Sequence, residues 1–138
     1  MKECVIKSEG FYICFQLKIF ESDGAYSSNT ILTISVISDN FSANTDMDID
    51  IKSFVVFVDA LSSLYTTLNG TAIIQEPYGE QQYIELSADR SGHINIRGKL
   101  NSNGRCGFLQ ELSFENCIDQ TYLPEFIGNL SSFCSRYR

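Results

Sequence analysis

The stretch FSANTDMDIDIKSFVVFVDALSSLYTTL, residues 41–68, contains a change of hydrophobic period that decides the fold. Its first part alternates between one face of mostly apolar side chains and one polar face, as a half-buried β-strand does. The positions of the first face are Phe41, Ala43, Thr45, Met47 and Ile49. After Asp50 the apolar residues recur every three or four positions, which predicts an amphipathic helix over residues 51–68 with Asp50 or Ser53 near its start.

Other segments of the chain repeat one of these two periods. Strand patterns precede the helix at 11–19 and 31–37, separated by turn residues at 21–28, and follow it at 71–75, 82–88, 93–99 and 108–116. Helical spacing returns at residues 123–133. We therefore expect one α+β domain over residues 1–138, with an antiparallel β-sheet of about seven strands and two amphipathic helices, in the order βββ-α-ββββ-α.

The apolar runs and the cysteines of the sequence predict a cytoplasmic protein. The chain of 138 residues has no apolar run of the roughly 18 residues that a membrane span needs, and residues 1–7 lack the apolar stretch of a signal peptide. Its five cysteines are an odd number, without a Cys-x-x-Cys pair. This usage predicts buried thiols in a reducing compartment, without a disulfide framework or a zinc site.

The charge is strongly acidic, at -7, with 17 acidic and 10 basic residues. A net negative field repels a polyanion, which disfavours nucleic acid as a partner. The excess is concentrated in residues 1–50, which carry -5, against -2 in residues 51–138. Two interpretations stay open: the acids keep a small protein soluble, or they form a docking face for a basic protein partner.

Asp46, Asp48 and Asp50 are expected on the outer face of the strand at 41–49. They resemble the opening of a calcium loop, but its sixth position is Ile51 in place of glycine, and its twelfth is Phe57 in place of glutamate. Alternate residues of a strand lie about 6.6–6.8 Å apart, so these carboxylates form a row that does not enclose one ion. We predict no metal site, and assign the three aspartates to partner binding.

A second candidate patch lies on the strand at 82–88. Tyr83, Glu85 and Asp89 are expected on one face of this strand and its turn. A tyrosine beside carboxylates is typical of an anchor in a protein interface, because its ring is apolar and its hydroxyl binds water or a partner.

Motifs for catalysis are absent from the sequence. There is no Gly-x-Gly-x-x-Gly, no Gly-Lys-Ser/Thr phosphate loop and no Gly-x-Ser-x-Gly elbow, and nothing indicates a cofactor. The chain has one histidine, His93, which its strand pattern places opposite the apolar face. Cys106 is the one cysteine that we consider as its nucleophilic partner. A small enzyme or ligand-binding domain with a pocket near His93 and Cys106 therefore stays an alternative.

The order of signals resembles a family of small bacterial proteins similar to the WapI-type immunity proteins of polymorphic toxin systems. Around the helix at 54–64, the resemblance is carried by the segments NFSA (40–43), NGTA (69–72), GHINIRG (92–98), LSFE (112–115) and DQTYL (119–123). It implies an acidic, cytoplasmic protein without cofactors, encoded beside a toxin, that acts by masking a toxin domain.

We therefore expect a non-catalytic protein-binding domain whose partner is a basic protein, such as a nuclease-type toxin domain. A nuclease has a basic surface because it binds phosphate. The row of aspartates would attract that surface over a long range and so speed association. An inert structural or regulatory module is a further alternative. An uncovered edge strand also leaves homodimerisation open.

Overall fold

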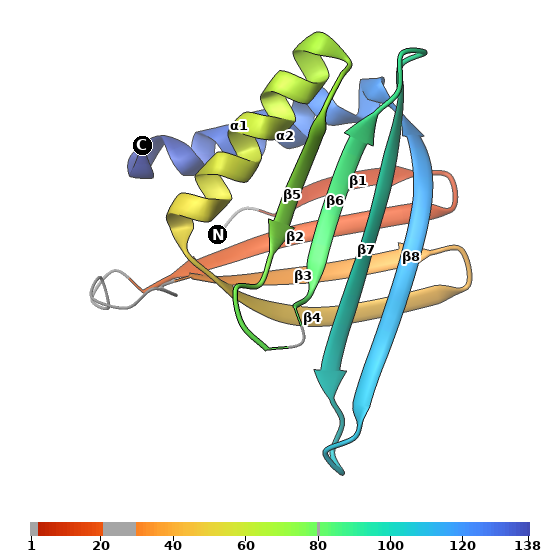
Figure 1. Ribbon diagram of the computed structural model, residues 1–138, viewed down its shortest axis with the longest axis vertical. Coiled ribbons are helices and arrows are strands. Elements are labelled where there is room, and N and C mark those ends of the chain that lie inside the picture. The colour runs from red at the N-terminus through yellow and green to blue at the C-terminus, as the bar shows by residue number, and fades with distance from the viewer. Residues whose placement is uncertain (1–2, 21–29, 80) are drawn as a thin grey trace.

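The computed structural model describes residues 3–20, 30–79 and 81–138, and its architecture is α+β, as the sequence predicts. It contains two antiparallel sheets of four strands, with one helix between them in the chain and one after them (Figure 1). The first sheet comprises β1 (Cys4–Ser8), β2 (Phe11–Ile19), β3 (Thr30–Ser38) and β4 (Phe41–Ile49), and the second comprises β5 (Thr71–Gln75), β6 (Tyr83–Ala88), β7 (His93–Asn103) and β8 (Leu109–Asp119). The helices are α1 (Ile51–Thr67) and α2 (Leu123–Cys134), the latter flanked by single 3-10 turns at Gln120–Tyr122 and Ser135–Tyr137.

The described residues form eight strands instead of about seven, because β1 is an additional edge strand beside β2. Strands β7 and β8 are also longer than the local pattern indicates. Residues 101–103, which look like part of a turn, continue β7 because they pair with β8 as far as Asn103 opposite Leu109. Cross-strand hydrogen bonding therefore overrides the local turn preference of Asn and Ser. The turn expected at 21–28 lies outside the described residues.

The two sheets pack face to face with their strands crossing steeply, and both helices lie against the same side of this pair (Figure 1). One side of each sheet enters a shared hydrophobic core. The ring of Phe15 on β2 lies at its centre, 6.4 Å from Phe54, 6.2 Å from Phe57 and 5.4 Å from Phe126 between ring centroids. Phenylalanines from one strand and both helices therefore join the helices to the first sheet.

The helices cover one edge of each sheet. Helix α2 packs on β1, and α1 packs on β5 and on α2. The strand orders β1-β2-β3-β4 and β5-β6-β7-β8 place the other two edges at β4 and β8, which contact each other. The strand predicted to carry the aspartates on its outer face, β4, is thus an edge strand.

Within the described ranges, no helix combines the length and apolarity that crossing a membrane requires.

Candidate functional site

Strand β4 presents Asp46 and Asp48 to solvent, because its pleat turns Thr45, Met47 and Ile49 into the core. Both aspartates are exposed. Oδ1 of Asp46 accepts a hydrogen bond of 2.7 Å from the hydroxyl of Thr33 on the neighbouring β3. Within the described part of the chain, the carboxylate of Asp48 contacts no Lys, Arg or His side chain. The strand therefore carries two carboxylates that no basic residue of the described ranges neutralises.

Asp50 differs from the other two aspartates, because β4 ends at Ile49 and Asp50 is the N-cap of α1. Its Oδ1 accepts a hydrogen bond of 3.0 Å from the backbone N–H of Lys52. Asp50 has the extended backbone of an N-cap residue, with φ -91° and ψ 135°. The predicted helix start at residue 51 is confirmed, and of the two candidate caps, Asp50 and Ser53, the structure has Asp50. The row on the strand consists of two aspartates rather than three.

The β5–β6 loop brings a further carboxylate and a tyrosine to the end of β4. Glu76 and Tyr78 line one hollow together with Asp48, and Tyr78 lines a neighbouring hollow with Asp50. Tyr78 is 70% exposed. We call this set, Asp46, Asp48, Asp50, Glu76 and Tyr78, the β4 acidic surface. It has the tyrosine beside carboxylates that is typical of an interface anchor, at a residue that the sequence analysis did not select.

Gln82 holds the loop against β4. Its Nε2 donates a hydrogen bond of 2.8 Å to the backbone oxygen of Asp46, and its backbone N–H donates one of 3.0 Å to Oε1 of Glu76. The side chain is only 3% exposed. The alternation of the predicted strand at 82–88 places Gln82 on the same face as Ile84 and Leu86, which was a signal for its burial that the sequence analysis did not use. No local pattern indicated its contact with Glu76.

The second predicted patch, at Tyr83, Glu85 and Asp89, has carboxylates that are already engaged. Oε1 of Glu85 accepts a hydrogen bond of 2.8 Å from Nε of Arg97, its partner across β6 and β7. The two charges form an ion pair on the outer face of the second sheet. Tyr83 is half-buried on the same face. This face is consequently of mixed charge and attracts a basic partner less than the β4 acidic surface does.

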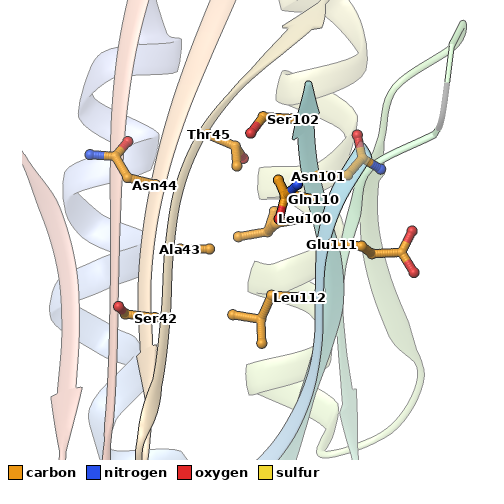
Figure 2. A pocket seen from close by; sticks show the side chains of 10 residues that line it. All are labelled: Ser42, Ala43, Asn44, Thr45, Leu100, Asn101, Ser102, Gln110, Glu111 and Leu112. Atoms are coloured by element: carbon orange, nitrogen blue, oxygen red, sulfur yellow. The ribbon is translucent and has the colours of Figure 1, made fainter. Parts of the chain in front are cut away.

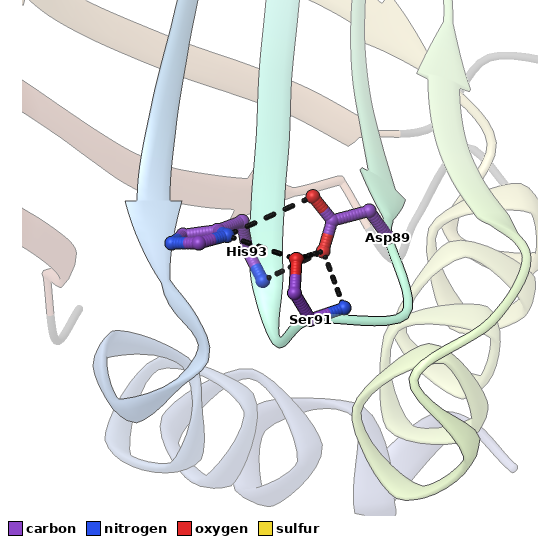
Figure 3. A network of polar contacts seen from close by, with 3 residues as sticks. All are labelled: Asp89, Ser91 and His93. Carbon is purple, nitrogen blue, oxygen red and sulfur yellow. Dashed lines mark hydrogen bonds and ion pairs between the residues drawn. The ribbon is translucent and has the colours of Figure 1, made fainter.

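Asp89 lies in the turn between β6 and β7, where it binds its own loop (Figure 3). Its Oδ1 accepts hydrogen bonds from the hydroxyl and the backbone N–H of Ser91 and from the backbone N–H of His93, at 2.8, 2.9 and 3.1 Å. The hydroxyl of Ser91 is the main cause that lowers the pKa of Asp89, followed by the N–H of His93. This carboxylate stabilises the turn.

His93 contacts Ser91 and Asp89 through the same ring nitrogen, with Nδ1 3.2 Å from the serine oxygen and 3.7 Å from Oδ2 of Asp89 (Figure 3). In a catalytic triad the serine contacts one nitrogen of the histidine ring and the carboxylate contacts the other nitrogen. Here both groups contact Nδ1, so the cluster is not a catalytic triad. The side chain of His93 is 57% exposed.

Cys106 lies in the turn that follows β7, whereas His93 begins this strand. At about 3.4 Å per residue, the length of β7 separates the two side chains by roughly 30 Å. A nucleophilic pair of His93 and Cys106 is therefore wrong. In the described ranges, no group of three or more His, Cys, Asp or Glu side chains could hold a metal ion.

Comparison with known proteins adds one finding. The sequence model of the immunity protein WapI-like family matches residues 5–138, which is nearly the whole chain. No curated protein matches the sequence.

Proposed function

The chain belongs to the immunity protein WapI-like family, and from this we propose that it binds a toxin domain in the cytoplasm and neutralises it without catalysing a reaction. We place the toxin-binding site at the β4 acidic surface. The observation that supports this choice is that the carboxylate of Asp48 has no basic neighbour within the described residues. The Tyr83 face remains a second, weaker candidate, because Arg97 neutralises Glu85.

The partner that suits this surface is basic, such as a nuclease domain that holds phosphate. Exposed carboxylates on a protein of net charge -7 create a long-range field that steers a cationic partner into encounter. Tyr78 lies beside Asp48 and supplies an apolar ring that a partner can bury. Steering by the acids and burial of the ring would together give a complex that forms quickly and dissociates slowly.

The test uses the toxin domain encoded next to this protein's own gene. Cells that produce the toxin domain alone should stop growing, and co-production of this protein should restore their growth. The association rate of the two purified proteins should fall as the salt concentration rises. Asp46→Asn/Asp48→Asn should lower the association rate and flatten its salt dependence.

The matched control is Glu3→Gln/Glu125→Gln, which changes the net charge equally at exposed positions beside β1 and α2, away from β4. It should change the association rate less. Equal effects of the two double variants would mean that only the net charge matters and that the β4 acidic surface is not the interface. Absence of binding and of growth protection would refute the toxin-neutralising function itself.

A further inference from the structure

A groove runs between the uncovered edges of the two sheets. Residues 42–45 of β4 form one wall, and residues of β7 and β8 form the other. The hollow between them measures about 250 Å³. It adjoins a second hollow of about 480 Å³, beside the β3–β4 turn and residues 111–115 of β8. Figure 2 shows Ala43, Leu100 and Leu112 pointing into the groove from its two walls.

The charged residues that line the groove are all acidic: Asp39, Glu111 and Glu115. Phe41 also lines it and is 66% exposed. Figure 2 shows Glu111 pointing away from the groove, on the outer face of the second sheet, where Glu115 lies opposite Arg97. The groove thus has an apolar floor, and its end at Thr45 leads along β4 to the carboxylates of Asp46 and Asp48. A peptide that fills it would need apolar side chains on one face and cationic side chains on the other.

The backbone of β4 adds hydrogen-bonding groups to this groove. The carbonyl of Asp46 points away from β3, because it accepts a hydrogen bond from Gln82. In an antiparallel ladder, residues two positions apart direct their backbone groups to the same side. Ser42 and Asn44 therefore present their N–H and C=O groups along the free edge, over a length of about 17 Å for residues 41–45.

We propose that this groove binds an extended segment of the toxin that carries lysine or arginine and adds a strand to the edge of β4. The inference rests on the proposed function and specifies the mode of contact. An added strand gains main-chain hydrogen bonds from Ser42 and Asn44. Its alternate side chains point to the apolar floor and to the outer face of β4, where Asp46 and Asp48 provide complementary charge.

A second copy of this chain fits the groove less well. Pairing β4 with β4 of another copy would bring two rows of Asp46 and Asp48 close together. Like charges on paired strands are destabilising. The same carboxylates favour a cationic strand in that position.

Hydrogen exchange of the wild-type protein, alone and in complex with the adjacent toxin domain, tests the proposal. The amides of Ser42 and Asn44 should exchange rapidly in the free protein and at least about tenfold more slowly in the complex. Equal rates in both states would overturn the groove as the docking site. Protection that appears without toxin and increases with protein concentration would also overturn it, because a second copy would then be the occupant.

Substitution provides the second measurement. Asn44→Pro removes an N–H that faces the free edge, where proline is tolerated, whereas Asn44→Ala keeps it. Asn44→Pro should weaken toxin binding about tenfold or more, while Asn44→Ala changes it less than about twofold. An Asn44→Pro protein that unfolds at the wild-type denaturant concentration and binds with wild-type affinity would refute strand addition. If the wild-type protein does not bind the toxin domain at all, the proposed function itself is refuted.

Discussion

Gln82 and Thr45, which belong to different halves of the chain, share a hydrogen bond of 2.6 Å from the threonine hydroxyl to Oε1 of the glutamine. The same oxygen accepts a hydrogen bond of 3.1 Å from the backbone N–H of Asn101 on β7. Nε2 of Gln82 binds the carbonyl of Asp46. One buried amide therefore links β4 to the second sheet, next to both the β4 acidic surface and the groove.

Replacing Gln82 by leucine should destabilise the protein by about 1–3 kcal/mol, because buried donors and acceptors on Thr45, Asp46 and Asn101 lose their partner. Denaturant unfolding measures the change. Gln75→Leu is the control, since Gln75 lies exposed on β5. Similar unfolding midpoints for the two variants would show that the link between the sheets contributes little.

Phe15→Ala should cost about 3–5 kcal/mol of unfolding free energy, since it leaves a cavity at the contact with Phe54, Phe57 and Phe126. Phe41→Ala removes the same side chain from an exposed position and should change the free energy by less than about 0.5 kcal/mol. Calorimetry or urea titration measures both values. A small effect at Phe15 would contradict its central position in the core.

Asp50→Ala should destabilise the protein by about 0.5–2 kcal/mol through loss of the N-cap, whereas Asp50→Asn keeps an acceptor for the N–H of Lys52 and should remain close to wild type. The unfolding midpoint measures this difference. Toxin binding then separates the two roles of this residue. A large loss of affinity in Asp50→Asn, with unchanged stability, would show that its charge also contacts the partner.

Asp89 should make stability depend on acid pH. Its folded-state pKa is lowered, mainly by the hydroxyl of Ser91. The ionised carboxylate therefore contributes stability that is complete above the unfolded-state pKa of about 3.9 and is lost as the pH falls through the folded value.

Two measurements check this role of Asp89. The unfolding midpoint of Asp89→Ala should lie below that of the wild type at pH 7, and the difference should shrink below about pH 3.9. In Ser91→Ala, NMR titration should show the pKa of Asp89 moving up towards its ordinary value. An unchanged pKa in this variant would assign the shift to another neighbour.

The five cysteines should fall into two classes towards maleimide. Cys106 and Cys117 are exposed and should react in the folded protein, whereas Cys4, Cys14 and Cys134 are buried and should react only after unfolding. Burial also raises the pKa of the Cys134 thiol to about 11, which reduces the reactive thiolate. Mass spectrometry before and after adding denaturant counts the modified sites. More than two rapid modifications would contradict the packing around the buried thiols.

Local periodicity predicted the elements on which the acidic surface is built. Residues 41–49 and 51–67 form β4 and α1, and Asp50 forms the cap between them. The outward direction of Asp46 and Asp48 follows from the pleat alone. Strand β1 was missed because its apolar residues Cys4, Val5 and Ile6 are consecutive and show no alternation.

The sequence by itself determined the class of fold, the alternation that exposes Asp46 and Asp48, and a helix from about residue 51, because backbone geometry sets these periods within a few residues. Only the tertiary structure decided that the strands form two sheets, that Glu76 and Tyr78 lie beside Asp48, and that Arg97 neutralises Glu85. These contacts join segments far apart in the chain. They depend on how sheets and loops pack, which no local period specifies.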